Sequence, residues 1–139
     1  MIIKFFKQNR KLIIFLTIIL VLLLIPTIAY VSAMQVKSFD STEFIEDGEV
    51  SSTAIVLGRI ATASEARSNA ERLWKYLMPD LYNDYKSTFV FYKPTEVYYD
   101  EKTDIWMLFG FQEWFVDKED AGMCICIRGY DGMVLYLGK

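Results

Sequence analysis

The sequence predicts an α+β domain that follows a single transmembrane helix. Two patterns carry this prediction. The first is an apolar run near the N-terminus that contains no charged side chain, Leu12–Met34. The second is one amphipathic helical pattern followed by short apolar segments that turn sequences separate. This order favours a two-layer domain in which one helix packs on a three- to four-stranded antiparallel sheet.

The apolar run Leu12–Met34 is long enough to cross a membrane. At ~1.5 Å of rise per residue its helix would exceed the ~30 Å thickness of a bilayer's hydrocarbon core. The run has four basic residues before it: Lys4, Lys7, Arg10 and Lys11. The positive-inside rule therefore places residues 1–11 in the cytoplasm and the domain outside, as a single-pass protein of the cell membrane.

A cleavable signal peptide is the alternative to this anchor. The small residues of Val31-Ser32-Ala33 have the spacing of a signal-peptidase site, with cleavage after Ala33. The run is longer than the ~7–15 apolar residues of a usual signal peptide, so we favour the uncleaved anchor. Both interpretations export the domain.

Composition limits the function. All 18 acidic residues lie after position 37, whereas four of the 15 basic residues precede the apolar run. An acidic domain is a poor candidate for nucleic-acid binding and suits a basic protein partner. The chain has no histidine, which excludes Ser-His-Asp and Cys-His nucleophile systems and histidine metal sites. We therefore expect neither catalysis nor a cofactor, and we interpret Cys124 and Cys126 as small apolar residues of the sheet.

A linker and a helix follow the apolar run. Residues 35–61 are rich in acids and show no sustained period, which predicts a loose linker, although Ala54–Leu57 could add a short edge strand. Thr62-Ala63-Ser64-Glu65 matches a capping box, so a helix begins there. Its apolar face recurs at helical spacing: Ala66, Ala70, Leu73 and Leu77. Pro79 ends this helix, and Pro79–Tyr85 predicts one further short turn of helix.

The remaining chain has the composition of strands. Its strand candidates are Phe89–Tyr92, Thr95–Tyr99, Ile105–Phe111, Met123–Arg128 and Met133–Leu137. Asp131-Gly132, within the turn Gly129–Gly132, predicts a hairpin of type I′, in which both central positions have positive φ.

The strands have two apolar faces. Ile105, Met107 and Phe109 share one face of their strand, and Trp106 and Leu108 share the other. One helix cannot cover both faces of the sheet, so the second face is expected to meet the linker, a second copy in a homodimer, or a partner. We interpret the W-x-x-x-G spacing of Trp106–Gly110 as core packing with a bulge.

The order of motifs is similar to that of a known family. A capped helix with AERLW leads to KPTEVYY, then to DIWMLFG, and finally to the hairpin CICIRGYDGMVLYLGK. Over Thr62–Lys139 this resembles bacterial immunity proteins with a nuclear-transport-factor-two-like (cystatin-like) fold. The resemblance implies a cystatin-like domain over 62–139 that binds and neutralises a protein toxin. The transmembrane segment and the acidic loop EWFVDKEDAG depart from the family's pattern.

A second resemblance gives an alternative function. Peptidase-propeptide-like (PepSY) domains are also small, exported α+β domains, and they often end in a hairpin with a similar turn. That resemblance implies an envelope module that binds a protease, a peptide or a cell-wall enzyme.

The loop Gln112–Gly122 is the candidate partner-binding site. It combines aromatic anchors with acidic side chains, as interface hot spots do: Glu113, Trp114, Phe115, Asp117, Glu119 and Asp120. The alternative is that the two aromatic residues tuck into the edge of the domain. The acid spacing matches no calcium-binding loop, so we expect no metal. Should the loop be ordinary surface, the contact would lie on the second sheet face around Trp106 and Leu108.

Overall fold

The computed structural model describes residues 9–42, 55–87, 94–110 and 122–138. Two compact units divide the chain, Met1–Ser32 and Ala33–Lys139. The predicted strand Phe89–Tyr92 and the predicted loop residues up to 121 lie outside the described residues. Each unit is described by itself.

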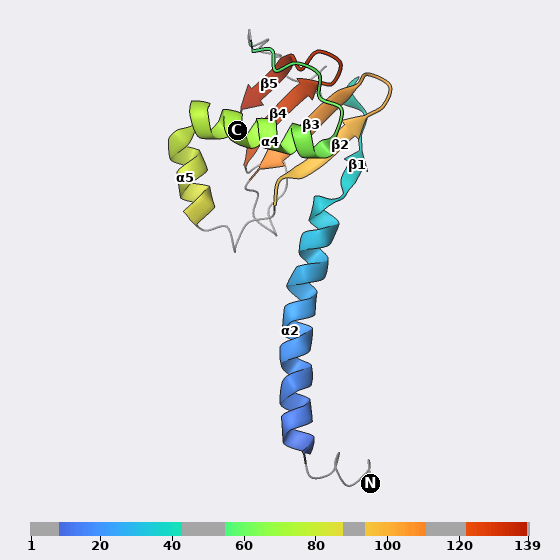
Figure 1. Cartoon of the computed structure of the whole chain (residues 1–139), viewed down its shortest axis with the longest axis vertical. Coiled ribbons are helices and arrows are strands. Elements are labelled where there is room, and N and C mark those ends of the chain that lie inside the picture. The colour runs from blue at the N-terminus through green and yellow to red at the C-terminus, as the bar shows by residue number, and fades with distance from the viewer. Residues whose placement is uncertain (1–8, 43–54, 88–93, 111–121, 139) are drawn as a thin grey trace. The chain divides into compact units, whose positions relative to one another are not determined.

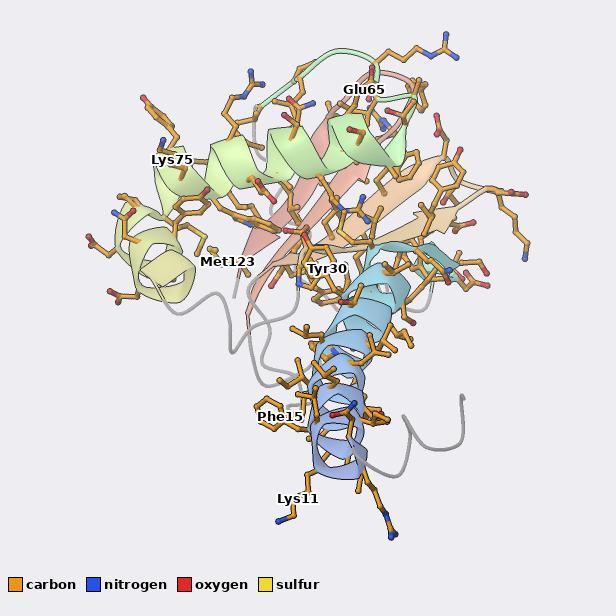
Figure 2. The ribbon with its side chains drawn as sticks, turned by 60° about the horizontal axis from the view of Figure 1, so that its bottom comes forward. Lys11, Phe15, Tyr30, Glu65, Lys75 and Met123 are labelled. Atoms are coloured by element: carbon orange, nitrogen blue, oxygen red, sulfur yellow. The ribbon has the colours of Figure 1, made fainter. Side chains whose placement is uncertain are left out.

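Helix α2 (Arg10–Met34) accounts for the described part of the first unit (Figure 1). This helix is long enough and apolar enough to cross a membrane. A signal sequence near an N-terminus has the same properties. Its side chains project outwards, as Phe15 does in Figure 2. The hydroxyls of Thr17 and Thr27 donate to the carbonyls of Ile13 and Leu23, at 2.8 and 2.7 Å. These two hydroxyls are therefore satisfied by carbonyls of the same helix.

The second unit contains a five-stranded mixed sheet in the order β1-β2-β3-β4-β5. The strands are β1 (Val36–Ser38), β2 (Glu96–Asp100), β3 (Ile105–Gly110), β4 (Met123–Arg128) and β5 (Val134–Gly138). Strands β2 to β5 form antiparallel pairs, and β1 pairs with β2 in parallel. The α+β class is confirmed, whereas the prediction of a three- to four-stranded antiparallel sheet is incomplete.

The additional strand β1 comes from the beginning of the predicted linker. Parallel neighbours need a long crossover connection, and the chain between β1 and β2 contains α4 (Ala63–Leu77) and α5 (Pro79–Ser87). The capping box of α4 is confirmed, because the Glu65 N–H donates to Thr62 Oγ1 and the Thr62 N–H donates to Glu65. Glu65 and Lys75 mark the two ends of α4 in Figure 2.

Helix α4 covers one face of the sheet (Figure 1). The buried side chains of this core come from the helix, from the sheet and from Ile60: Ala66, Ala70, Leu73, Trp74, Tyr82, Val97, Trp106, Leu108, Met123, Ile125, Ile127 and Val134. The predicted helical face and the strand alternation of β4 both agree with this cluster, although Leu77 is exposed.

Residues 55–60 lie along the start of β5, within the predicted linker. The Val134 N–H donates to the Ile55 carbonyl at 3.0 Å, and the Leu57 N–H donates to the Gly132 carbonyl at 3.0 Å. Val56 and Met133 form an isolated antiparallel bridge. This segment therefore extends the edge of the sheet, as Ala54–Leu57 suggested.

The β4–β5 turn lies at Gly129–Gly132 as predicted, but its type differs. Gly132 has a φ of 71°, whereas Asp104 is the only described non-glycine residue with positive φ. Asp131 therefore does not adopt the conformation that a type I′ turn requires. The Gly132 N–H donates to the Arg128 carbonyl at 2.8 Å, and the Arg128 N–H donates to the Met133 carbonyl at 2.9 Å. The connection is a four-residue loop that ends in a left-handed glycine.

Candidate partner-binding surface

The six residues of the predicted partner loop all lie outside the described residues: Glu113, Trp114, Phe115, Asp117, Glu119 and Asp120. The structure gives the residues that flank this segment, Gly110 at the end of β3 and Gly122 before β4. Strand pairing places both at the end of the sheet where β1 begins. Partner contact by the loop stays a prediction.

The sequence pattern places the alternative contact on the second sheet face, around Trp106 and Leu108. That assignment of Trp106 and Leu108 to the second face is wrong. Trp106 and Leu108 lie on the face that α4 covers. The Trp106 ring stacks on Tyr99, with centroids 4.2 Å apart, and its Nε1–H donates to the Ile60 carbonyl at 3.2 Å. Both residues are therefore core residues, and the face opposite α4 carries the other side chains of β3.

The face opposite α4 has its own apolar cluster. Its buried members are Tyr98, Ile105, Met107, Phe109, Cys124 and Cys126, with Phe39, Leu135 and Tyr136 packed against them. The ring of Tyr98 meets those of Phe39 and Phe109 edge to face. These side chains are almost fully buried, and Phe39 of the predicted linker is one of the residues that pack against them.

A polar group lies at the β1 edge of this second face. Lys37 Nζ lies 3.1 Å from Glu96 Oε1, and the Tyr98 hydroxyl donates to Glu96 Oε2 at 2.9 Å. Lys37 also lies over the Tyr98 ring, 5.2 Å from its centroid. Burial, helped by the Glu96 carboxylate, raises the pKa of Tyr98 well above its ordinary value. These contacts join β1 to β2. We call Lys37, Glu96 and Tyr98 the β1–β2 clamp and assign it a structural role.

The two cysteines lie on the same face of β4. Both are free and buried. A hydrogen bond with Cys126, together with burial, raises the pKa of the Cys124 thiol far above its ordinary value. A protonated thiol is a poor nucleophile and a poor metal ligand. In the parts of the chain that the structure describes, no three His, Cys, Asp or Glu side chains come together as a metal site.

Two turns meet at the far end of the sheet, where β1 and β2 finish (Figure 1). The Gly129 N–H, in the β4–β5 turn, donates to the carbonyl of Asp104 in the β2–β3 turn at 2.6 Å. The Tyr99 hydroxyl donates to Asp104 Oδ1 at 3.0 Å. The far end is therefore a bonded group of turns rather than a set of independent loops.

Asp100 anchors the β1 side of this end. Its carboxylate is buried and accepts hydrogen bonds from the Ser41 N–H, the Thr103 hydroxyl and the Lys102 N–H, at 3.0, 2.8 and 2.9 Å. The donors on Ser41, Thr103 and Lys102 hold the pKa of Asp100 well below its usual range. The carboxylate is fully engaged within the chain, so its role is structural.

An open pocket of about 420 Å³ lies beside Asp100. Its lining comes from two segments: Ser38, Phe39, Asp40, Tyr99, Asp100, Glu101 and Lys102. Phe39 packs on the face opposite α4, whereas Tyr99 packs on the face that α4 covers. The two rings therefore do not enclose a ligand between them, and we assign no ligand to this pocket.

The β4–β5 turn, at the far end of the sheet, carries exposed side chains that contact one another. We define the hairpin tip as Arg128, Tyr130, Asp131 and Met133 together with the neighbouring Val56. Tyr130 is 59% exposed, and the Arg128 guanidinium lies over its ring, 4.6 Å from the centroid. Arg128 also donates two hydrogen bonds to Asp131, from Nε to Oδ1 at 3.0 Å and from Nη2 to Oδ2 at 2.6 Å. Arg128 lowers the pKa of Asp131 to about 2.

From the sequence, we interpreted Gly129–Gly132 only as a turn. The overlooked signal is Tyr130 itself, because a large aromatic at a tight turn has no core to join. Loops on a rigid scaffold are where binding residues concentrate, and tyrosine and arginine are enriched at interface hot spots. The hairpin tip is therefore a candidate partner-binding surface in addition to the predicted loop.

Comparisons with protein-family models, with curated proteins and with solved structures found no match to this chain. The candidate surface therefore rests on its own geometry.

Proposed function

We propose that the chain is a membrane-anchored, immunity-type protein that binds and neutralises a protein toxin outside the cytoplasm. The observation that carries this proposal is the hairpin tip, where the exposed Tyr130 ring lies under the Arg128 guanidinium and Asp131 accepts two hydrogen bonds from that guanidinium. Fixed, exposed aromatic side chains supply contact area at a low cost in conformational entropy. Such a surface suits inhibition by occlusion, which needs no chemistry from the inhibitor.

The anchor is the second part of the proposal. Helix α2 would lie in the cell membrane with its N-terminus in the cytoplasm, as the basic residues before the run favour. Cleavage after Ala33 would release the same domain, because the hairpin tip is built from residues after position 55. Topology is tested with a reporter fused after Lys139 that is active only when exported. Activity of a cytoplasm-only reporter at that position would overturn export.

The chemistry of the chain favours binding over catalysis. Histidine is missing from the whole sequence, and the Cys124 thiol is held in its protonated form. The buried carboxylates Asp100 and Glu96 are engaged by donors from their own domain. A general base needs an available lone pair within reach of its substrate, and these two groups use theirs for structure.

Neutralisation is tested in cells that export the toxic domain of a candidate toxin encoded beside this chain. The full chain should restore growth, and so should the variant Tyr76→Ala, because Tyr76 is 80% exposed on α4 and lies outside the hairpin tip. Tyr130→Ala should lose protection while keeping wild-type abundance in the membrane. Failure of the wild-type chain to protect would refute the immunity proposal. A peptidase or sensor kinase encoded in that place would favour the envelope-module alternative.

A further inference from the structure

We infer that the folded domain closes the cleavage site after Ala33, so that the chain keeps α2 as a permanent anchor. This inference rests on the export that is part of the proposed function, and it identifies the part of the fold that prevents processing. Three observations carry it: the burial of Ala33, the contact of Arg67 with Met34, and the single residue that separates α2 from β1.

Ala33 is the residue just before the bond that a signal peptidase would cut. The small residues of Val31-Ser32-Ala33 place that bond between Ala33 and Met34. In the structure this stretch is still helical, because α2 ends only at Met34. Ala33 is 5% exposed and is the only residue of α2 that is buried, whereas Val31 is 55% exposed. Ala33 and Met34 belong to the same compact unit as the sheet. The bond is therefore part of the folded domain and is shielded from a protease.

Arg67, on α4, holds the chain on the other side of this bond. Its Nη2 donates to the Met34 carbonyl, and its Nε donates to the carbonyl of Thr95, just before β2, at 3.0 Å. The last carbonyls of a helix have no partner within the helix, and α2 has no basic residue in its own last turn. Arg67 therefore caps the C-terminus of α2 from a distant part of the sequence, at a position where the helix dipole also favours a cation.

The chain after the bond enters the sheet almost at once. Only Gln35 separates α2 from β1, and Val36 pairs with Val97 of β2. A protease must take several consecutive residues into its active site. Cleavage after Ala33 therefore requires a local opening that breaks the Arg67 contacts and exposes Ala33, and its rate follows the population of that open state.

Retention of α2 also limits where the domain works. A loose linker over 35–61 would let the domain move far from the membrane. Because β1 begins one residue after α2, the anchored domain stays at the membrane surface instead. The toxin that it neutralises is therefore one that acts at that surface or crosses it.

The first experiment determines the N-terminus of the full-length chain by mass spectrometry, in cells that export it with a tag after Lys139. The wild type should be recovered with residues 1–33 still attached. Arg67→Ala loses both hydrogen bonds, so chains that begin at Met34 should appear ~30-fold faster. The control is Arg72→Ala, because Arg72 lies on the same helix and donates to Asn69 within it. This control should stay intact, and resistance to added trypsin confirms that the variants are folded.

Two further variants test the mechanism. Arg67→Lys keeps the charge but lacks the planar fork that reaches both carbonyls, so it should be cleaved at an intermediate rate. Val31→Phe places a large side chain at an exposed position of the small-residue stretch, so it should abolish cleavage when it is combined with Arg67→Ala. Cleavage of that double variant at the same bond would overturn the assignment of the site.

The outcomes separate this inference from the immunity proposal. Wild-type chains that begin at Met34 would overturn the inference and leave the immunity proposal standing, because the released domain keeps the hairpin tip. An intact Arg67→Ala variant would also overturn it, since the length of the apolar run would then be what prevents cleavage. Growth in the presence of the toxin is measured in the same cells. A wild-type chain that stays intact but gives no protection refutes the immunity proposal alone.

Discussion

The indole ring of Trp74, on α4, lies directly over the Cα of Gly110, the last residue of β3. A Cβ placed on Gly110 would lie 2.7 Å from Cη2 and 3.0 Å from Cε3 of this ring, and Trp74 is completely buried. Core packing thus explains the spacing Trp106–Gly110, because Trp106 fills the core and Gly110 admits a second indole. The predicted bulge is wrong, because β3 pairs in continuous register with both β2 and β4. Close approach of α4 to the sheet depends on that missing side chain.

The first prediction is that Gly110→Ala destabilises the domain. The added methyl group overlaps an aromatic ring that has no free space to enter, and overpacking of this kind costs ~1–3 kcal/mol. The comparison is Gly138→Ala, at the end of β5, where the methyl group would meet the hydroxyl end of the half-buried Tyr136 rather than a completely buried indole, so it should cost less. Chemical unfolding in detergent should separate the two variants. Equal stability of Gly110→Ala and Gly138→Ala would show that α4 is free to shift.

The second prediction concerns two glycines with positive φ that differ in their surroundings. Gly132 has a φ of 71° and Gly58 a φ of 81°. A Cβ on Gly132 would overlap the carbonyl of Gly58, whereas a Cβ on Gly58 would meet nothing within 4 Å. Gly58→Ala should cost ~1 kcal/mol from backbone strain alone, and Gly132→Ala clearly more. Melting temperatures of the two variants give the comparison, and a larger loss for Gly58→Ala would contradict this arrangement of the hairpin.

Local chemistry explains which elements were predictable. The capping box at Thr62 and Glu65 and the apolar alternation of β4 are properties of neighbouring residues, so they are visible in the sequence. Strand β1 was not predicted, because its three residues have no period of their own and depend on the pairing of Lys37 with Glu96, far along the chain. The turn at Asp131-Gly132 is located correctly from the sequence, but the turn also accepts hydrogen bonds from the N–H groups of Leu57 and Ile60, which no local pattern encodes.

The candidate site was harder to predict than the fold. Both faces of β3 are apolar, and sequence alone did not show that Trp106 belongs to the face under α4. It contacts Tyr99 on the neighbouring strand β2 and the carbonyl of Ile60, which is distant in sequence. Tyr130 was visible in the sequence as a large aromatic residue at a tight turn, but its stacking with Arg128 is a feature of the folded hairpin that the sequence pattern does not show.

The third prediction tests the β1–β2 clamp, formed by Lys37, Glu96 and Tyr98. Lys37→Met should cost ~1–3 kcal/mol, because it removes the Lys37 ammonium from the buried Glu96 carboxylate. The double variant Lys37→Met with Glu96→Gln removes both charges and should recover part of that loss. Hydrogen exchange of the β1 amides measures the local effect. Unchanged exchange in Lys37→Met would show that β1 is held by its backbone bonds alone.

The fourth prediction is a loss of stability in acid to which Asp100 contributes. Its pKa is lowered in the folded chain from an ordinary value of 3.8, so the unfolded chain binds the proton first. The contribution of Asp100 is therefore complete above about pH 5 and is lost as pH falls below about 4. Asp100→Asn should be less stable than wild type at pH 7, with a shallower decline in acid. Unfolding free energies measured from about pH 7 to pH 3 give both slopes, and parallel slopes would contradict a depressed pKa.

The last prediction separates the loop Gln112–Gly122 from the hairpin tip. If Trp114 anchors the partner, Trp114→Ala should cost ~2 kcal/mol or more of binding and leave the fold intact by circular dichroism. Reversing the charges of Asp117 and Glu119 to lysine should instead slow association with a basic partner, and added salt should slow the wild type. The opposite result is expected for the hairpin tip. Its binding should be insensitive to salt, because the charges of Arg128 and Asp131 compensate each other. The kinetics of one partner therefore assign the contact: a salt-dependent association rate that the double reversal abolishes belongs to the loop, and a salt-independent affinity that Tyr130→Ala reduces belongs to the tip.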